Sequence, residues 1–150
     1  MLRIELPDEL SDELVDAFRR LLPQLSRSAP TLDAEAVKEI VSSPATTVLA
    51  ARDGGEIIGL LTLAVFRAPS GLRAWIEDVV VDETARGRGT GEALTREAVR
   101  LAGKRGARTI DLTSRPSRQA ANRMYEKVGF RKRETNVYRY ELESPASGSL

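Results

Sequence analysis

The sequence predicts a single α/β domain with a central mixed sheet and helices on both faces, within a chain of 150 residues. Short runs of β-forming residues indicate several strands. One pair of these runs is joined by Asp53-Gly54-Gly55-Glu56, a strong signal for a β-hairpin. A later strand, helix and strand follow one another, which predicts two parallel neighbours in the sheet.

The first third of the chain predicts one strand and two helices. Residues 2–6 alternate between apolar and polar side chains, as a half-buried strand does. Apolar residues between positions 10 and 22 recur at helical spacing, and Pro23 follows the last of them, which predicts the end of that helix. Asp33 is a suitable N-cap for the second helix.

The middle of the chain predicts three strands and a third helix. Residues 46–52 and 57–66 are rich in β-forming side chains on either side of the hairpin turn. A loop with proline and glycine then leads to a strand at residues 74–81. A glycine-rich turn follows this strand and opens a helix at about residues 89–102.

The last third predicts a short strand at residues 109–113 and a helix at 117–128, which Gly129 ends. Alternation at residues 137–142 predicts a final strand. The domain is therefore expected to span residues 1–143, and residues 144–150 are expected to form a disordered tail.

The composition excludes several kinds of site. The chain has no Cys and no His, so we expect no disulfide and no metal bound by thiolate or imidazole. A Ser-His-Asp triad is excluded as well, which leaves acid–base chemistry to Asp, Glu, Tyr, Lys, a terminus or water. No run of eighteen apolar residues is present, so no membrane span is expected. The lack of Cys and of a signal peptide favours a cytoplasmic location.

The charge is distributed unevenly along the chain. Residues 1–85 hold 15 acidic and 8 basic side chains, a net charge of −7, whereas residues 86–150 hold 7 acidic and 15 basic, a net charge of +8. The pattern agrees either with an ordinary solvated surface or with a C-terminal half that faces a polyanion. The chain has few aromatic residues and is nearly neutral overall, so a small phosphorylated ligand is favoured over nucleic acid.

The most informative segment is the turn Arg86-Gly87-Arg88-Gly89-Thr90-Gly91, which follows a valine-rich strand and opens a helix. Glycines let backbone N–H groups approach a ligand, and the first turn of a helix has free N–H groups and a partial positive charge. Such a turn suits a pyrophosphate, and two arginines add full charges beside it. Glu92 and Leu94 exclude a dinucleotide-binding fingerprint, and a Walker ending is missing. A plain glycine-rich connection is the alternative.

The same turn resembles the acyl-CoA pyrophosphate loop of the GNAT acetyltransferase superfamily, whose pattern is Arg/Gln-x-x-Gly-x-Gly/Ala. The segment Ala121-Asn122-Arg123-Met124-Tyr125-Glu126-Lys127-Val128-Gly129-Phe130 is similar to the second motif of that family, a helix with Tyr followed by Gly-Phe. The order of the elements expected between residues 2 and 142 also matches. The chain departs from the family at Arg118, where Asn is common, and at Thr90, where an aliphatic residue is usual.

The resemblance implies acetyl-CoA as the acyl donor and two parallel strands, residues 74–81 and 109–113, that splay apart. The pantetheine arm would lie in the gap and bond the backbone of the first strand like an added strand. This agrees with the physics of an open edge, whose backbone amides need partners. The residues implied to bind acetyl-CoA are Val79, Val80, Val81, Arg86, Gly87, Arg88, Gly89, Thr90, Gly91, Arg118 and Tyr125.

Tyr125 is the candidate donor of a hydrogen bond to the departing thiolate. It follows Arg118 by seven residues, so the two lie on nearly the same helix face, about 10.5 Å apart along the axis. An arginine near the phosphates and a phenol near the sulfur would suit one extended cofactor. The alternative is that Tyr125 is a core residue packed against Met124 and Val128.

Glu77 and Asp78 lie mid-strand among apolar residues, where carboxylates are rare and costly to bury. We therefore expect one of them to face the acceptor. Strand parity puts Glu77 on one face with Trp75 and Val79, and Asp78 on the other face, unless a bulge intervenes. By resemblance, a Glu on this strand serves as the catalytic base, often through water, and Glu77 is the preferred candidate. Asp78, an ordered water, or an ion pair with an arginine are the alternatives.

The sequence therefore predicts an N-acetyltransferase that moves an acetyl group from acetyl-CoA to a primary amine. No motif in segments 20–35 or 66–73, on the acceptor side, identifies the amine, which could belong to a sugar phosphate, polyamine, antibiotic, amino acid or protein. A non-catalytic acyl-CoA sensor is the first alternative, because the same turn would suffice for it, and a nucleic-acid-binding domain is the second. A homodimer is left open.

Overall fold

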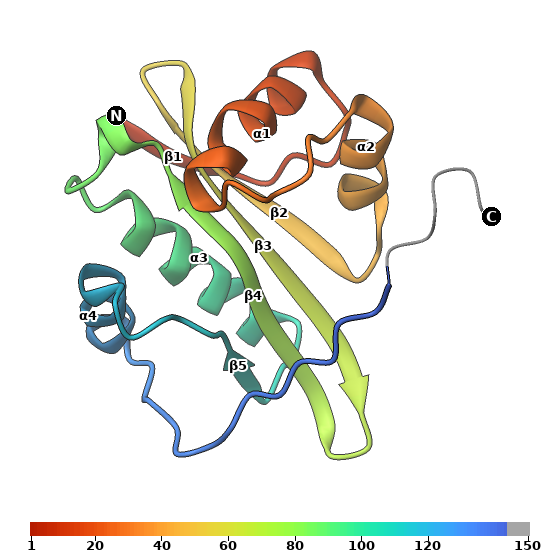
Figure 1. Ribbon diagram of the computed structural model, residues 1–150, viewed down its shortest axis with the longest axis vertical. Helices are drawn as coiled ribbons and strands as arrows, with labels where there is room; N and C mark the ends of the chain where they lie inside the picture. The colour runs from red at the N-terminus through yellow and green to blue at the C-terminus, as the bar shows by residue number, and fades with distance from the viewer. Residues whose placement is uncertain (144–150) are drawn as a thin grey trace.

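A computed structural model describes residues 1–143 as one five-stranded sheet with helices on both faces (Figure 1). The tail predicted at residues 144–150 lies outside the described residues. The strands are β1 (Leu2–Glu5), β2 (Thr46–Asp53), β3 (Glu56–Ala68), β4 (Gly71–Val81) and β5 (Thr109–Asp111). The helices are α1 (Asp12–Leu25), α2 (Ala34–Ser42), α3 (Thr90–Lys104) and α4 (Gln119–Val128), with a short 3-10 turn, η1 (Glu83–Ala85), before α3.

The strands lie in the order β1-β2-β3-β4-β5, so each pairs with its neighbours in the sequence. The first four are antiparallel to one another, and β5 is parallel to β4, which confirms the predicted mixed sheet. The β2–β3 turn has Gly54 and Gly55 at φ 60° and 91°, as its sequence predicts. The connection between β3 and β4 is shorter than predicted, because both strands continue to a tight turn in which Ala68 pairs with Gly71.

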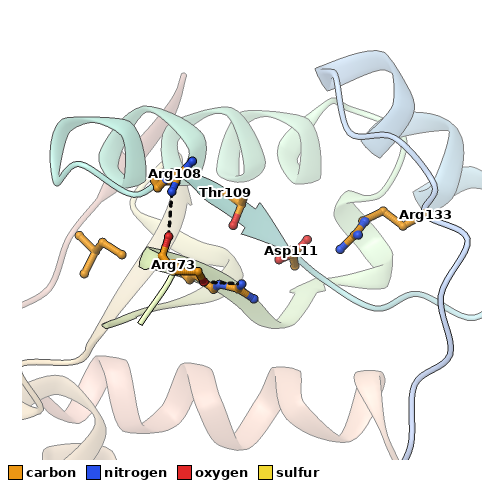
Figure 2. A pocket seen from close by; sticks show the side chains of 7 residues that line it. Arg73, Arg108, Thr109, Asp111 and Arg133 are labelled. Carbon is orange, nitrogen blue, oxygen red and sulfur yellow. Dashed lines mark hydrogen bonds between the residues drawn. The ribbon is translucent and has the colours of Figure 1, made fainter. Parts of the chain in front are cut away.

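The splayed pair of parallel strands is confirmed. β4 and β5 pair only from Arg73 with Thr109 to Trp75 with Asp111, and Figure 2 shows the start of this pairing. Beyond these residues β4 continues to Val81, whereas β5 ends at Asp111. The β5 side of β4 is therefore open along its second half.

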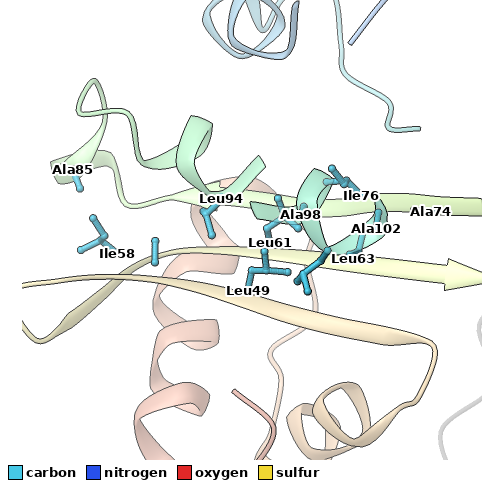
Figure 3. Close-up of a cluster of buried hydrophobic side chains, with 12 residues drawn as sticks. Leu49, Ile58, Leu61, Leu63, Ala74, Ile76, Ala85, Leu94, Ala98 and Ala102 are labelled. Atoms are coloured by element: carbon cyan, nitrogen blue, oxygen red, sulfur yellow. The ribbon is translucent and has the colours of Figure 1, made fainter. Parts of the chain in front are cut away.

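Two apolar clusters hold the helices on the two faces. The cluster beneath α3, drawn in Figure 3, joins Leu94 and Ala98 to sheet residues such as Leu61. The cluster on the other face joins Leu14 and Val37, from α1 and α2, to residues such as Val48, Leu60 and Val80. Each such leucine or valine stabilises the fold by about 1.5–3 kcal/mol relative to an exposed side chain.

The helix ends follow the predicted caps with one exception. The Asp33 carboxylate accepts a hydrogen bond of 2.8 Å from the Ala36 N–H, as an N-cap does. Pro23, however, does not end α1, which continues to Leu25. Proline removes only its own N–H, and the next residues can still donate; Ser26 N–H bonds the Leu22 carbonyl at 3.1 Å.

The strand predicted at residues 137–142 is wrong. Residues 130–143 form neither helix nor strand, and Tyr138, Tyr140 and Leu142 are 87%, 88% and 83% exposed. Alternation indicates β propensity, but a strand also needs a neighbouring edge on which to pair. The outer edge that β5 offers is only three residues long. Within residues 1–143, no helix combines the length and the apolar run that crossing a membrane requires.

Candidate functional site

The turn after β4 is fixed at its start by Asp82. One carboxylate oxygen accepts from the backbone and hydroxyl of Thr84, and the other pairs with the Arg20 guanidinium at 2.9 Å. The N–H of Thr84, above all, and the charge of Arg20 hold the pKa of Asp82 below its ordinary value. The side chain of Gln24 accepts from the Glu83 N–H at 2.8 Å. Helix α1 thus anchors the turn that leads into α3.

The glycine-rich turn has two residues in the left-handed conformation beside open space. Gly87 and Gly89 both have φ 80°, in the left-handed region, and an added Cβ at either would meet only open space. Gly89 is the N-cap of α3, and no side chain caps this helix. The first N–H groups of α3 therefore have no partner within the helix.

Both arginines of the turn, Arg86 and Arg88, already form bonds with protein groups. Arg86 donates from Nε to the Val81 carbonyl at 3.2 Å. Arg88 lies against the carbonyls of η1 and forms an ion pair with Asp53, on the β2–β3 turn, at 3.6 Å. Both retain other N–H groups, since a guanidinium has five donors.

The backbone of Val81 faces the open side of β4. The Asp82 N–H bonds Ile58 of β3 at 2.8 Å, and within a trans peptide the preceding carbonyl points the opposite way. The Val81 carbonyl therefore points away from β3, and by strand alternation the backbone of Val79 does so too. These backbone groups could form hydrogen bonds with an extended ligand that lies along the open edge of β4.

A β-bulge in β4 changes the parity expected from the sequence. Leu60 pairs with Val80 and Thr62 with Glu77, so one residue of β3 opposes two of β4, Asp78 and Val79. Before the bulge Ile76 packs beneath α3; after it Val79 packs there and Val80 faces α1. The expectation that Val79 shares a face with Glu77 is therefore wrong.

A cavity of about 830 Å³ opens where β4 and β5 separate, a size typical of a small-molecule site. It brings together four residues predicted for the site: Glu77, Val79, Arg118 and Tyr125. Glycine-turn residues 86–91 do not line it and lie beyond the end of β4. Among the other predicted residues, Val80 and Thr90 have buried side chains, 3% exposed each, so only their backbones could meet a ligand.

The two carboxylates at the cavity differ in their surroundings. Glu77 is exposed and accepts a hydrogen bond of 2.7 Å from the indole Nε1 of Trp75. Asp78 is in the bulge with φ 52°, the one positive φ outside glycine among residues 1–143. Burial, and then the charge of Glu77, raise the pKa of Asp78. Strain and a perturbed carboxyl are typical of functional sites.

Tyr125 contributes its ring to the wall of the cavity from α4. Its ring packs edge-on against Phe130, with the ring centres 5.9 Å apart. Burial raises the pKa of Tyr125, and the nearby Arg118 charge opposes that shift. The phenol therefore stays protonated near neutral pH. Within residues 1–143 its hydroxyl has no hydrogen-bond partner, so it can donate to a ligand.

Sequence reasoning missed several residues that line the same cavity. The Ser114 hydroxyl is buried there and forms no hydrogen bond with the residues of the described chain. Arg27, Arg115 and Arg139 also line it. Arg27 falls in the predicted acceptor-side segment 20–35, but no spacing rule links it to β4. Within the described chain, no group of His, Cys, Asp and Glu could hold a metal ion.

One family model matches most of the chain, and solved structures share its fold. Residues 8–130 match the acetyltransferase (GNAT) family. No curated protein matches the chain. A solved transcriptional regulator from Bacillus halodurans C-125 is 26% identical, with a TM-score of 0.78, over 94% of this chain and 100% of that one. An acetyltransferase from Trypanosoma brucei is 24% identical, with a TM-score of 0.74, over 95% and 100%. Aminoglycoside N-acetyltransferase AAC(6')-Iy in complex with CoA is 19% identical, with a TM-score of 0.78, over 94% and 95%.

Proposed function

The chain belongs to the GNAT family of acetyltransferases, and we propose that it transfers the acetyl group of acetyl-CoA to a primary amine in the cavity between β4 and β5. The observation that carries this proposal is the meeting of Glu77 and Tyr125 in one cavity beside an open strand edge. A carboxylate that can accept a proton and a phenol that can donate a hydrogen bond to a thiolate thus line the same cavity.

The residues present suit acetyl-CoA. The uncapped start of α3 and the turn at residues 86–91 would hold the pyrophosphate, with Arg86 beside it. The backbone of Val79 and Val81 would bond the pantetheine amides along the open edge. The unpartnered Ser114 hydroxyl supports a polar ligand in the gap. Arg118, at the start of α4, adds positive charge to the same cavity.

Acetyl-CoA supplies an activated thioester when bound, and the protein must then manage two protons. An alkyl ammonium has a pKa of about 10.4, so little free amine exists near pH 7. Glu77 would take this proton, directly or through water, which leaves the nitrogen lone pair free to attack the acetyl carbon. The bond formed joins nitrogen to that carbon, and the bond broken joins the carbon to sulfur. The nitrogen releases its second proton to solvent as the amide forms.

Tyr125 would donate its hydroxyl hydrogen bond to the departing sulfur. Complete proton transfer is unfavourable, because a phenol with a pKa of about 10 is a weaker acid than a thiol of about 8.5, a difference of about 2 kcal/mol. Burial raises the pKa of Tyr125 and enlarges this difference. We therefore assign Tyr125 as a hydrogen-bond donor that stabilises the thiolate, which finally takes its proton from solvent.

A mass-spectrometric screen tests this function and identifies the acceptor. The protein is incubated with acetyl-CoA and a mixture of sugar amines, polyamines, amino acids, aminoglycosides and peptides. We expect one class of amine to be acetylated by the wild type and not by a Glu77→Gln, Tyr125→Phe double variant. A matched Glu39→Gln, Tyr140→Phe variant, changed at two exposed positions outside the cavity, should retain activity. Equal product from the wild type and the double variant would refute the assigned site.

A further inference from the structure

A second cavity, which we name the arginine cavity, lies at the other end of β4. It has a volume of about 410 Å³, and its polar lining consists of Ser70, Arg73, Arg108, Thr109, Asp111 and Arg133. The three arginines come from β4, from the residue before β5, and from the segment after α4 (Figure 2). Segments far apart in the sequence thus bring three guanidinium groups to one space.

Two of the three arginines are held by hydrogen bonds, and none of the three is neutralised. Arg73 donates to the Ser70 hydroxyl and Arg108 to the Ser70 carbonyl, both at 2.8 Å. The stem of Arg108 lies over Gly71, where an added Cβ would come within 2.5 Å of it. Across residues 1–143, none of the three arginines forms an ion pair.

The charge of the cavity favours an anion. Three guanidinium groups face one carboxylate, Asp111, which leaves a net charge of +2. The hydroxyls of Ser70 and Thr109 add donors. Guanidinium groups bind the paired oxygens of a carboxylate or phosphate through parallel hydrogen bonds.

The position of the cavity excludes the pyrophosphate of the donor as its ligand. Arg73 precedes Val81 by eight residues, about 26 Å along an extended strand, and the glycine-rich turn lies beyond Val81. Arg73 and Glu77, in contrast, share one face of β4 and are four residues apart, or about 13 Å. Thr109 and Asp111 of β5 are the partners of Arg73 and Trp75, and so extend the same face.

We infer that the arginine cavity binds an oxyanion, a carboxylate or phosphate, carried by the acceptor at about 13 Å from its reacting amine. The site would thus select amines with a distant acidic group. The anion site stands on the arginine geometry alone, whereas its assignment to the acceptor rests on the proposed function.

A binding experiment tests the anion site without any acetyl transfer. Inorganic phosphate and citrate are titrated separately into the isotope-labelled protein, and backbone N–H signals are followed by NMR. We expect shifts at residues 70–73 and 108–109 that are lost in Arg73→Gln and in Arg133→Gln, and are retained in Lys38→Gln, an exposed change on α2. Shifts with phosphate only, or with citrate only, identify the oxyanion preferred. No shift at these residues with either anion would overturn the proposal.

A kinetic experiment tests the assignment to the acceptor. Matched amines that end in a carboxylate, a phosphate or a neutral hydroxyl are compared by kcat/KM. We expect an acidic amine to be preferred, Arg73→Gln to reduce that preference about tenfold or more, and the control Lys38→Gln to leave it unchanged. An equal loss for acidic and neutral amines would overturn the assignment. If no amine is acetylated at all, the proposed function fails, and the NMR titration still decides the anion site.

Discussion

The indole N–H of Trp75 donates a hydrogen bond of 2.7 Å to Oε1 of Glu77, two residues further along the same face of β4. This bond engages one carboxylate oxygen, and within residues 1–143 the other oxygen forms no hydrogen bond. An indole can only donate, so it orients the carboxylate without competing for a proton. Glu77 is thereby held at the cavity with one oxygen available.

If Glu77 accepts the ammonium proton, Glu77→Gln should lower kcat/KM by about 10²–10⁴-fold near neutral pH. The loss should shrink as the pH approaches the pKa of the amine, about 10.4, because free amine then becomes abundant. The pH profile of kcat/KM measures this, with Glu39→Gln as the matched control. A loss that is the same at every pH would contradict the assignment and transfer the role to Asp78 or an ordered water.

Replacement of Tyr125 by Phe removes only the hydroxyl and retains the ring that packs against Phe130. We expect kcat to fall by about 10²–10⁴-fold with little change in the affinity for acetyl-CoA. High pH should not rescue this variant, because the missing donor is not restored. Since burial raises the pKa of Tyr125, the wild type should lose no activity through its ionisation below about pH 10. Full activity in Tyr125→Phe, with Tyr140→Phe as control, would make Tyr125 a packing residue.

Gly89→Glu should abolish binding of acetyl-CoA measured by calorimetry, because it places a carboxylate where the pyrophosphate is expected. Gly89→Ala is the matched control: it shares the backbone strain at φ 80°, about 1–2 kcal/mol, but adds no charge. An added Cβ meets open space there, so both variants should fold. We expect Gly89→Ala to bind more tightly than Gly89→Glu. Equal affinities of the two variants for acetyl-CoA would contradict the placement of the pyrophosphate at this turn.

A stability prediction concerns Arg52, which joins β2 to Glu5 on β1 and to both carboxylate oxygens of Glu13 on α1. Its hydrogen bonds lower the pKa of both carboxyls from an ordinary 4.5. Their contribution to stability is therefore complete above about pH 4.5 and is lost as the pH falls through the lowered values. Arg52→Met should lower the melting temperature at pH 7, and the difference from the wild type should shrink towards pH 3. A constant difference would contradict this ion-pair origin.

The sequence predicted the local structure that depends on neighbouring residues in the chain. Glycines between a strand and a helix predicted the turn at residues 86–91. The position of Tyr125 four residues before Gly129 predicted that it lies near the end of a helix. The cap at Asp33 and the hairpin turn at Gly54 are local in the same sense, and each is present.

What the sequence did not predict depends on pairing between distant segments. The bulge at Asp78 arises from the pairing of β4 with β3, which the sequence of β4 alone does not reveal. Strand parity therefore placed Val79 on the wrong face. Residues 137–142 alternate as a strand does, but the outer edge that β5 offers for pairing is only three residues long. The three arginines of the arginine cavity come from separate elements, and no spacing within the sequence connects Arg73 with Arg133.

Release of CoA from acetyl-CoA tests the central claim most directly, because it separates an enzyme from a protein that only binds acyl-CoA. The chain has no Cys, so a thiol reagent would report CoA without a background from the protein. With an accepted amine present, we predict amine-dependent release of CoA in large molar excess over the protein, and a rate strongly reduced in Tyr125→Phe. Binding of acetyl-CoA with no release beyond the rate measured without protein, across the whole panel of amines, would contradict the proposed acetyl transfer.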